Sequence, residues 1–255
     1  MQSSYIYGRN PVLEAIRADK IEKVFISYNA KGKLIGAIYA ESKKRRIRVV
    51  KYDRKKFSEL EKREFPPKAN TQGVAALKKM VETFTLTEII ERSYRDNDYP
   101  VFVALDGIND PHNLGAIARS VECSGASGLI LPERHTAPIT AGTIKSSAGA
   151  IEHIDVAKVN NFTQALEKMK REGFWVIGTE ASAKQLYYEK KYNIPVVLVI
   201  GSEGKGMRPS VKKHCDDFIK IPLQGKVSSL NASVSAGIIL FEIAKQKKNM
   251  TRKTV

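Results

Sequence analysis

The sequence predicts an α/β protein in which a mostly parallel sheet is covered by helices and preceded by a small α/β domain. Strand-like and helix-like segments take turns along most of the 255-residue chain, as they do in proteins built on a parallel sheet. Residues 196–200 (VVLVI) are apolar without interruption, which is typical of a strand buried on both faces. We therefore expect a basic domain at residues 1–79, a linker at 80–99, the main domain at 100–248 and a disordered tail at 249–255.

Short alternating segments fill the first domain. A helix is expected to begin at Asn10 and Pro11, because proline suits the first turn of a helix. Apolar spacing predicts further helices at residues 34–45 and 56–63, and strands at 23–27, 47–52 and 73–77. The linker is expected to carry one helix at residues 87–95, capped by Thr85 or Thr87.

The same patterns continue through the main domain. They predict strands at residues 101–105, 128–131, 151–159, 174–179, 196–200 and 218–221. Helices are expected at residues 113–124 and 162–171, from Pro209 onward, and at 232–246. Residues 247–255 are polar and basic, so the chain is expected to fray there.

The charge of the chain is large and unevenly spread. The formal net charge is +16, and residues 1–79, with 20 Lys and Arg against 8 Asp and Glu, supply +12 of it. Such an excess on a folded domain points to a polyanionic partner. Cations gathered at residues 43–48 and 54–56 favour nucleic acid over a merely solvated surface.

Composition also excludes or disfavours several classes of protein. No apolar run is long enough to cross a bilayer, and the first residues lack the apolar segment of a signal peptide, so we expect a cytoplasmic protein. Two cysteines and four histidines fit neither a disulfide framework nor a zinc site, and no metal is expected. A dinucleotide-binding enzyme is poorly supported, because GSEGKG at residues 201–206 departs from the GxGxxG pattern.

Three polar clusters follow predicted strands, at the carboxyl ends where parallel sheets bind ligands. The clusters contain Asn109 to Asn113 together with Arg119, then Glu203 in the glycine-rich loop 201–206, and then Ser229 with Asn231. Taken singly, each has a plainer explanation as a helix cap, a carboxylate facing a helix N-terminus or a surface arginine. Taken together, they indicate one pocket formed by several loops.

The loops belong to three longer stretches: LDGINDPHNLGAIARSVECSGASGLIL at residues 105–131, GSEGKGM at 201–207 and IPLQGKVSSLNASVSAGIILFE at 221–242. In this order they resemble the signature motifs of the SpoU (TrmH-like) family of RNA ribose 2′-O-methyltransferases, within the SPOUT superfamily. The likeness covers about residues 101–245. The first domain resembles the ribosomal-protein-like RNA-binding domain that precedes the catalytic domain in the bacterial 23S rRNA guanosine-2′-O-methyltransferase.

The resemblance implies an α/β fold with a C-terminal trefoil knot in which S-adenosyl-L-methionine binds. The family's cofactor positions fall on Gly201, Ile221 and Leu230, with Thr179 and Glu203 as weaker candidates. The family also implies a homodimer whose site is completed near the dimer interface.

The resemblance places Arg119 beside the ribose hydroxyl that is methylated. Because a guanidinium is effectively always protonated, we expect Arg119 to anchor an RNA phosphate and polarise the hydroxyl instead of removing its proton. Asn113, Ser229 and Asn231 are expected to orient the ribose and the loops. Glu203 is expected to hold the glycine-rich loop or Asn113 in place.

Three kinds of partner or role remain open. A guanosine of 23S rRNA is the expected target, because the basic first domain suits a large structured RNA, and tRNA is the second candidate. An RNA-binding accessory protein without turnover is the third, which the full set of site residues disfavours. Ala232 and Ser235 stand where the family often has Val and Ala, which keeps the side chains small.

Overall fold

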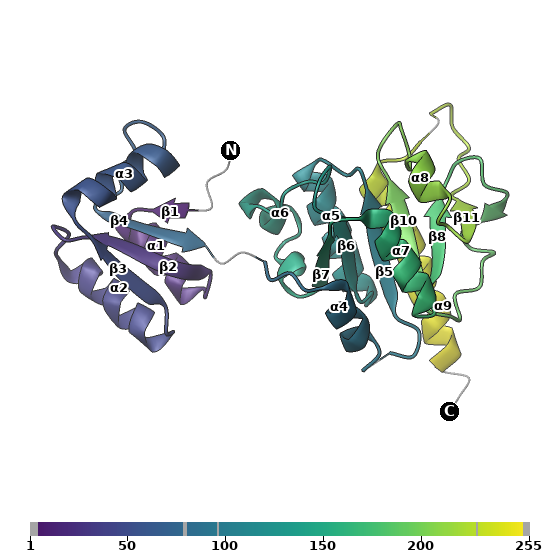
Figure 1. Ribbon diagram of the computed structural model, residues 1–255, viewed down its shortest axis with the longest axis horizontal. Helices are drawn as coiled ribbons and strands as arrows, with labels where there is room; N and C mark the ends of the chain where they lie inside the picture. The colour runs from purple at the N-terminus through teal and green to yellow at the C-terminus, as the bar shows by residue number, and fades with distance from the viewer. Residues whose placement is uncertain (1–4, 79–80, 96, 228, 252–255) are drawn as a thin grey trace. The chain divides into compact units, whose positions relative to one another are not determined.

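The chain forms two compact units, Met1–Met80 and Val81–Val255 (Figure 1). The computed structural model describes residues 5–78, 81–95, 97–227 and 229–251. Of the predicted linker and tail, residues 80, 96 and 252–255 lie outside the described residues. Each unit has its own sheet and its own buried core.

The first unit is a four-stranded sheet with helices on both faces. Its elements are β1 (Tyr5–Tyr7), α1 (Arg9–Arg17), β2 (Ile21–Ser27), α2 (Lys33–Lys44), β3 (Arg48–Tyr52), α3 (Arg54–Glu64) and β4 (Val74–Lys78). The strand order is β1-β4-β2-β3, with β4 antiparallel to β1 and β2, and β3 parallel to β2. Along β2, Val24 and Ile26 pack with α1 and α2, whereas Phe25 packs with α3, because successive side chains point to opposite faces.

The second unit is built on a seven-stranded sheet in which every recorded strand pair is parallel. Its strands are β5 (Val101–Asp106), β6 (Gly128–Pro132), β7 (Asp155–Val159), β8 (Trp175–Thr179), β9 (Gln185–Leu186), β10 (Val196–Gly201) and β11 (Asp217–Lys220). Their order across the sheet is β7-β6-β5-β10-β8-β11-β9.

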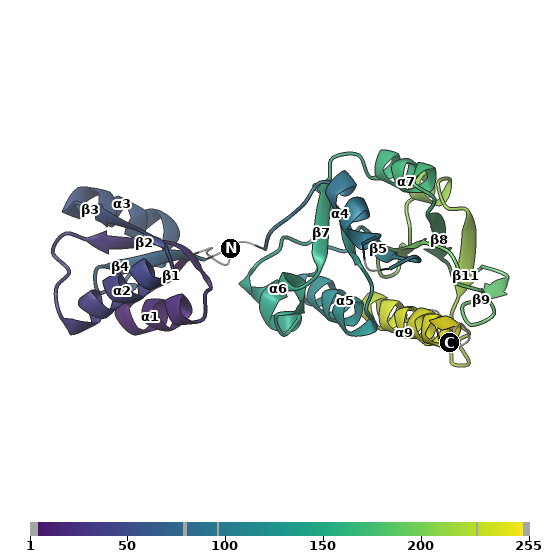
Figure 2. The ribbon, with the colours of Figure 1, turned by 90° about the horizontal axis from the view of Figure 1, so that it is seen from below.

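Helices cover both faces of this sheet (Figure 2). They are α4 (Leu86–Ser93), α5 (Pro111–Ser124), α6 (Ala141–Ser146), α7 (Phe162–Arg171), α8 (Pro209–Lys212) and α9 (Ala232–Thr251), with a 3-10 turn η1 (Ala150–Glu152). In β10, Leu198 and Ile200 face α5 and α9, while Val197 and Val199 face α4 and α7. The uninterrupted apolar run of β10 is thus a consequence of burial on both sides.

The predicted α/β class, with a mostly parallel sheet and a smaller first domain, is confirmed. Differences lie in the connections. The helix expected within a linker is α4, whose Leu86 and Ile89 pack in the core of the second unit. The last helix continues to Thr251 instead of ending at residue 246, and α5 begins at Pro111 instead of residue 113. The short elements β1, β9 and α6 had no periodic signal, and the predicted strand 151–159 is η1 followed by β7.

Within the described residues, no helix has the length and apolar character needed to span a membrane.

Leu198 provides a test of this core. It is fully buried at the centre of β10, between Val103 of β5 and Ile177 of β8. Leu198→Ala should lower the free energy of unfolding by about 2–5 kcal/mol, because it leaves a cavity that the neighbouring strands cannot close. Urea denaturation followed by the fluorescence of Trp175, the single tryptophan of the chain, measures this directly.

The matched control is Leu223→Ala, since Leu223 is 39% exposed and lies in the same unit as Trp175. It should change stability by less than about 0.5 kcal/mol. Equal midpoints for Leu198→Ala and the native chain would contradict the assignment of β10 to the centre of the core.

Candidate functional site

The sheet of the second unit reverses its direction of winding between β5 and β10. From β5 the chain moves outward to β6 and β7, whereas β10, β8 and β11 lie on the other side. The carboxyl ends of β5 and β10 meet here, with Asp106 paired opposite Gly201. Parallel sheets bind ligands in the crevice at such a switch point, so this edge is where a site is expected.

The loop that leaves β10 is a tight turn that requires glycine. The amide of Ser202 donates to the carbonyl of Gly206 (3.1 Å), and the Gly206 amide donates to the Ser202 carbonyl (2.8 Å). A Cβ atom on Gly201 would lie 2.4 Å from the carbonyl carbon of Gly206, a distance that backbone cannot tolerate. Gly204 and Gly206 have φ angles of +73° and +64°, which L side chains rarely adopt.

Three side chains join this loop to two others. Asn113, on the first turn of α5, donates from Nδ2 to Oε1 of Glu203 (2.8 Å). Asn231, just before α9, donates from Nδ2 to the same Glu203 oxygen (2.6 Å) and to Oδ1 of Asn113 (2.9 Å). Residues from the β5–α5, β10–α8 and β11–α9 connections therefore meet at one carboxylate.

The explanation of such residues as a helix cap, or as a carboxylate facing a helix N-terminus, is also correct for Asn231 and Glu203. Asn231 caps α9, since its Oδ1 accepts from the amides of Ser233 (2.9 Å) and Val234 (3.3 Å). Glu203 faces the same helix N-terminus, with its Oε1 3.4 Å from the Ala232 amide. Asn113 is not a cap, because Asp110 fills that position and accepts from the His112 amide.

All four residues predicted to bind a cofactor line one cavity of about 320 Å³. They are Thr179 at the end of β8, Gly201 at the end of β10, Ile221 after β11 and Leu230 before α9. Ser229 and Glu203 line the same cavity. Ile200, Ile219 and Ile239 give the cavity an apolar lining, and the glycine-rich loop adds backbone polar groups, a mixture typical of small-molecule sites.

A second cavity, of about 720 Å³, adjoins the first along the glycine-rich loop. It shares Ser202, Glu203 and Gly206 with the first cavity and adds Asn113 and His135. The glycine-rich loop thus contributes to the lining of both cavities.

Comparison with known proteins bears on both units. A sequence profile described as the SpoU rRNA Methylase family matches residues 100–241, and one described as RNA 2′-O ribose methyltransferase substrate binding matches residues 5–84. The chain belongs to the SpoU methylase family.

Similar proteins carry names consistent with an RNA methyltransferase. The putative TrmH family tRNA/rRNA methyltransferase YacO of Bacillus subtilis is 39% identical over 247 residues, covering 96% of this chain and 97% of that protein. The structure of an rRNA methyltransferase from Sinorhizobium meliloti, solved with bound AdoMet, is 25% identical with a TM-score of 0.65, covering 96% of this chain and 87% of that one. A TrmH/SpoU tRNA-modifying enzyme of A. aeolicus is 30% identical with a TM-score of 0.56, covering 65% of this chain and 84% of that one.

Arg119 of this SpoU-family chain lies apart from the other predicted site residues. It is exposed on α5, beside Cys123, and among the described residues it lines neither cavity. One chain therefore brings together Asn113, Glu203 and Asn231, but not Arg119. The described residues also contain no group of three His, Cys, Asp or Glu side chains that could hold a metal ion.

Asp106 and Arg208 form a contact that sequence reasoning missed. The Asp106 side chain has no exposed surface and accepts from the Arg208 backbone amide (2.7 Å) and from Arg208 Nε (2.6 Å). The residues are 102 positions apart, so no local pattern links them. The available signal was a carboxylate directly after an apolar strand, because a buried charge needs a partner.

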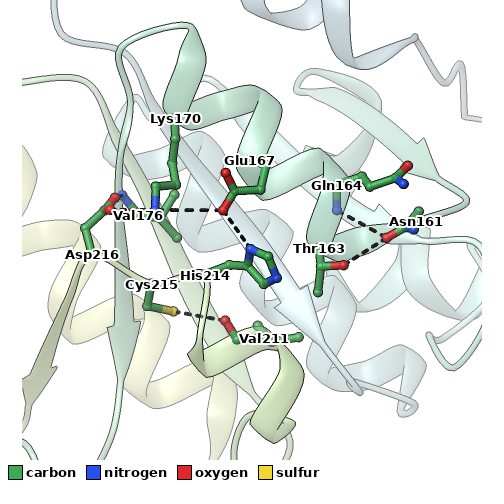
Figure 3. Close-up of polar contacts among 10 residues, drawn as sticks. All are labelled: Asn161, Thr163, Gln164, Glu167, Lys170, Val176, Val211, His214, Cys215 and Asp216. Atoms are coloured by element: carbon green, nitrogen blue, oxygen red, sulfur yellow. Dashed lines mark hydrogen bonds and ion pairs between the residues drawn. The ribbon is translucent and has the colours of Figure 1, made fainter.

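A polar network joins α7 to the residues that precede β11 and to β8 (Figure 3). Glu167 of α7 accepts through Oε1 from Nδ1 of His214 (2.7 Å), and Lys170 pairs with Asp216 (2.8 Å). Asp216 also accepts from the amide of Val176 in β8 (2.9 Å). These contacts fasten α7 to the start of β11 and to β8, the strands whose far ends line the cavity.

The network is structural in character. The His214 hydrogen bond holds the pKa of Glu167 below its usual value, and the Asp216 hydrogen bond raises the pKa of Lys170. Burial raises the pKa of Cys215 to about 12, so that its thiol is protonated at neutral pH and is a poor nucleophile.

Removing Asp106 should loosen the glycine-rich loop. Asp106→Ala leaves the Arg208 amide and guanidinium without their acceptor and should cost about 1–3 kcal/mol of stability, limited because the Arg208 side chain is 47% exposed. Arg208→Ala should cost at least as much, because it leaves a buried carboxylate with only the backbone amide.

Urea denaturation monitored by Trp175 fluorescence reports both values. Asp106→Asn, which keeps an oxygen acceptor, is the matched control and should cost less than Asp106→Ala. Asp106→Ala with native stability would show that this contact does not hold the loop.

Proposed function

We propose that this RNA methyltransferase transfers the methyl group of S-adenosyl-L-methionine to a ribose 2′-hydroxyl, most specifically in a guanosine of 23S rRNA. The observation that carries the proposal is the meeting of Asn113, Glu203 and Asn231 beside a cavity lined by all four predicted cofactor residues. It supports an active site because three separate loops are fixed around one small-molecule pocket.

The first cavity suits S-adenosyl-L-methionine in size and in the character of its walls. Ile219, Ile221 and Leu230 offer apolar contact for an adenine ring, and backbone groups of the glycine-rich loop approach closely because Gly201 has no side chain. When bound, the cofactor supplies an electrophilic methyl group. The cavity volume of about 320 Å³ lies within the range of small-molecule sites.

We propose that the target nucleotide enters the second cavity, which adjoins the first along the glycine-rich loop. Asn113 lines this cavity, and Lys205, Arg208 and His135 add groups that can contact phosphate or base. The amide of Asn113, fixed by Glu203, would then orient the ribose. Holding the acceptor in line with the donor supplies most of the gain in rate, since displacement at a methyl group depends on alignment.

We propose that Arg119 comes to this site from a second copy of the chain. In one copy it lines neither cavity, yet α5, which carries it, packs beside α9. α9 exposes Val234 and Phe241, two turns apart on one face and 48% and 52% exposed, which an isologous dimer would cover. The guanidinium of Arg119 would bind an RNA phosphate and polarise the hydroxyl. The C-terminal trefoil knot stays a prediction.

The substrate favoured here is rRNA, because the basic first unit suits a large structured RNA. tRNA is the alternative, supported by the B. subtilis relative, whose name includes both RNAs, and by the A. aeolicus structure, whose name gives tRNA. The test is mass-spectrometric mapping of 2′-O-methyl groups in rRNA and tRNA from cells with and without the gene. One guanosine of 23S rRNA should lose its methyl group. Loss at a tRNA position would transfer the proposal to tRNA, and unchanged methylation in both RNAs would overturn it.

Subunit complementation tests the shared site. Arg119→Ala should abolish methyl transfer while leaving the affinity for S-adenosyl-L-methionine unchanged, because Arg119 does not line the first cavity. Gly201→Ala should abolish cofactor binding, because the added Cβ would meet the Gly206 backbone. Co-expression of the two inactive variants should restore roughly a quarter of native activity, since half of random dimers contain one intact site.

Methyl transfer and equilibrium dialysis with labelled cofactor measure these outcomes. No activity in the mixed sample would place Arg119 at its own chain's site. Loss of cofactor binding in Arg119→Ala would mean that this residue supports the fold.

A further inference from the structure

The first unit presents several loops at one edge of its sheet. β1, β2 and β3 run in the same direction, because β1 and β2 are both antiparallel to β4 and β3 is parallel to β2. Their carboxyl ends therefore lie at one edge, where the chain continues into residues 8–10, 28–33 and 53–56. Residues 66–73, which precede β4, lie at the same edge. We call these four segments the loop edge.

The loop edge is strongly basic. Its cations are Arg9, Lys31, Lys33, Arg54, Lys55, Lys56 and Lys68, and its single carboxylate is Asp53. Asp53 is engaged as the cap of α3, where it accepts from the Lys56 amide (2.9 Å). The net charge of +6 over these short segments is half of the excess carried by residues 1–79.

Hydrogen bonds hold the loops of this edge together. Arg9 donates from Nε to the carbonyl of Gln72 (3.2 Å), and its amide donates to Oε1 of the same residue (3.2 Å). The Arg9 guanidinium also lies against Gly32, 3.5 Å from the position of a Cβ. The edge is therefore a preformed surface that needs little ordering when it binds.

Tyr28 stands at this edge with its ring exposed. The Tyr28 amide donates to the carbonyl of Tyr52 (2.9 Å), which ties the residue to the end of β3. Its side chain is 63% exposed, and no stacking partner is recorded for its ring among the described residues. Apart from Leu34, it is the sole large apolar side chain exposed within the described part of the first unit.

The opposite edge of the sheet is also basic, but it differs from the loop edge in its exposed aromatic residues. It carries the exposed cations Arg17, Lys20, Lys43, Lys44, Arg46 and Arg48. Within residues 5–78, however, this edge exposes no aromatic ring to the extent that Tyr28 is exposed. Positive charge alone attracts any nucleic acid, whereas a ring among cations suits an unpaired base beside its phosphates.

We propose that the loop edge binds an unpaired segment of RNA, with Tyr28 stacking on a base while Arg9, Lys31 and Lys33 contact the flanking phosphates. This inference rests on the proposed function, because it takes RNA to be the substrate. It adds which surface of the first unit binds the RNA, and that the bound segment is unpaired. Stacking of this kind is tolerant of sequence, because every base has a π face, and it requires bases that are not paired in a duplex.

The test is binding of the full-length chain to fluorescein-labelled oligouridylate and to an RNA duplex of matched length, about 12 nucleotides. Tyr28→Ala should weaken binding to oligouridylate by about 5- to 100-fold and leave duplex binding within about twofold of native. Tyr28→Phe, which keeps the ring, should bind both RNAs within about twofold of native. Thermal unfolding of each variant should match the native chain, since Tyr28 is largely outside the core.

A charge variant at the opposite edge, combining Lys43→Ala, Lys44→Ala and Arg46→Ala, is the matched control. It should weaken binding to both RNAs by similar factors and reduce the salt dependence, because it removes only charge. Native oligouridylate binding by Tyr28→Ala, or an equal loss for oligouridylate and duplex, would overturn the proposal, as would a native chain that binds neither RNA. These measurements need no methyl donor, so a failure of methyl transfer would not alter their outcome.

Discussion

The carboxylate of Glu203 is the contact on which the geometry of the site depends. Its Oε1 atom receives the amide groups of Asn113 and Asn231, which come from positions 90 and 28 residues away. Each such hydrogen bond at an exposed position stabilises the free chain by only about 0.5–1.5 kcal/mol. The arrangement therefore needs support beneath it, and it gains strength when a ligand excludes water from the loops.

That support comes from the buried strands and from the contacts that hold the glycine-rich loop. The loops leave strands whose interiors are fully buried, so their starting points are fixed by the core. The Asp106–Arg208 pair fastens the far end of the glycine-rich loop, and the absence of a side chain at Gly201 lets the loop close on itself. The chain thus places glycine where the backbone must turn, and buried apolar residues in the strands from which the loops leave.

The two units offer different kinds of surface to a ligand. The first unit offers charge and an exposed ring, which in our proposal would bind an unpaired RNA segment without reading a particular base. The second unit offers two adjoining cavities bordered by oriented amides, of which the first would hold the cofactor and the second the reacting nucleotide. Selection of the nucleotide would then require both, since neither surface is specific alone.

The sequence by itself determined the longer strands and helices of both units, because burial imposes a periodic or continuous apolar pattern that local residues record, whereas the short elements β1, β9 and α6 carry no such pattern. It also pointed to Asn113, Glu203 and Asn231, which the structure brings together, and to several of the residues that line the first cavity, since turns, caps and motif likeness are local signals. The tertiary structure alone decided that α4 belongs to the second core, that Asp110 and not Asn113 caps α5, and that Asp106 meets Arg208. It also separated Arg119 from the cavities of its own chain. The position of the α5 cap is a local choice among several polar residues, whereas the other facts depend on contacts between residues far apart along the chain, and a contact of that kind leaves no periodic trace in the sequence on either side of it.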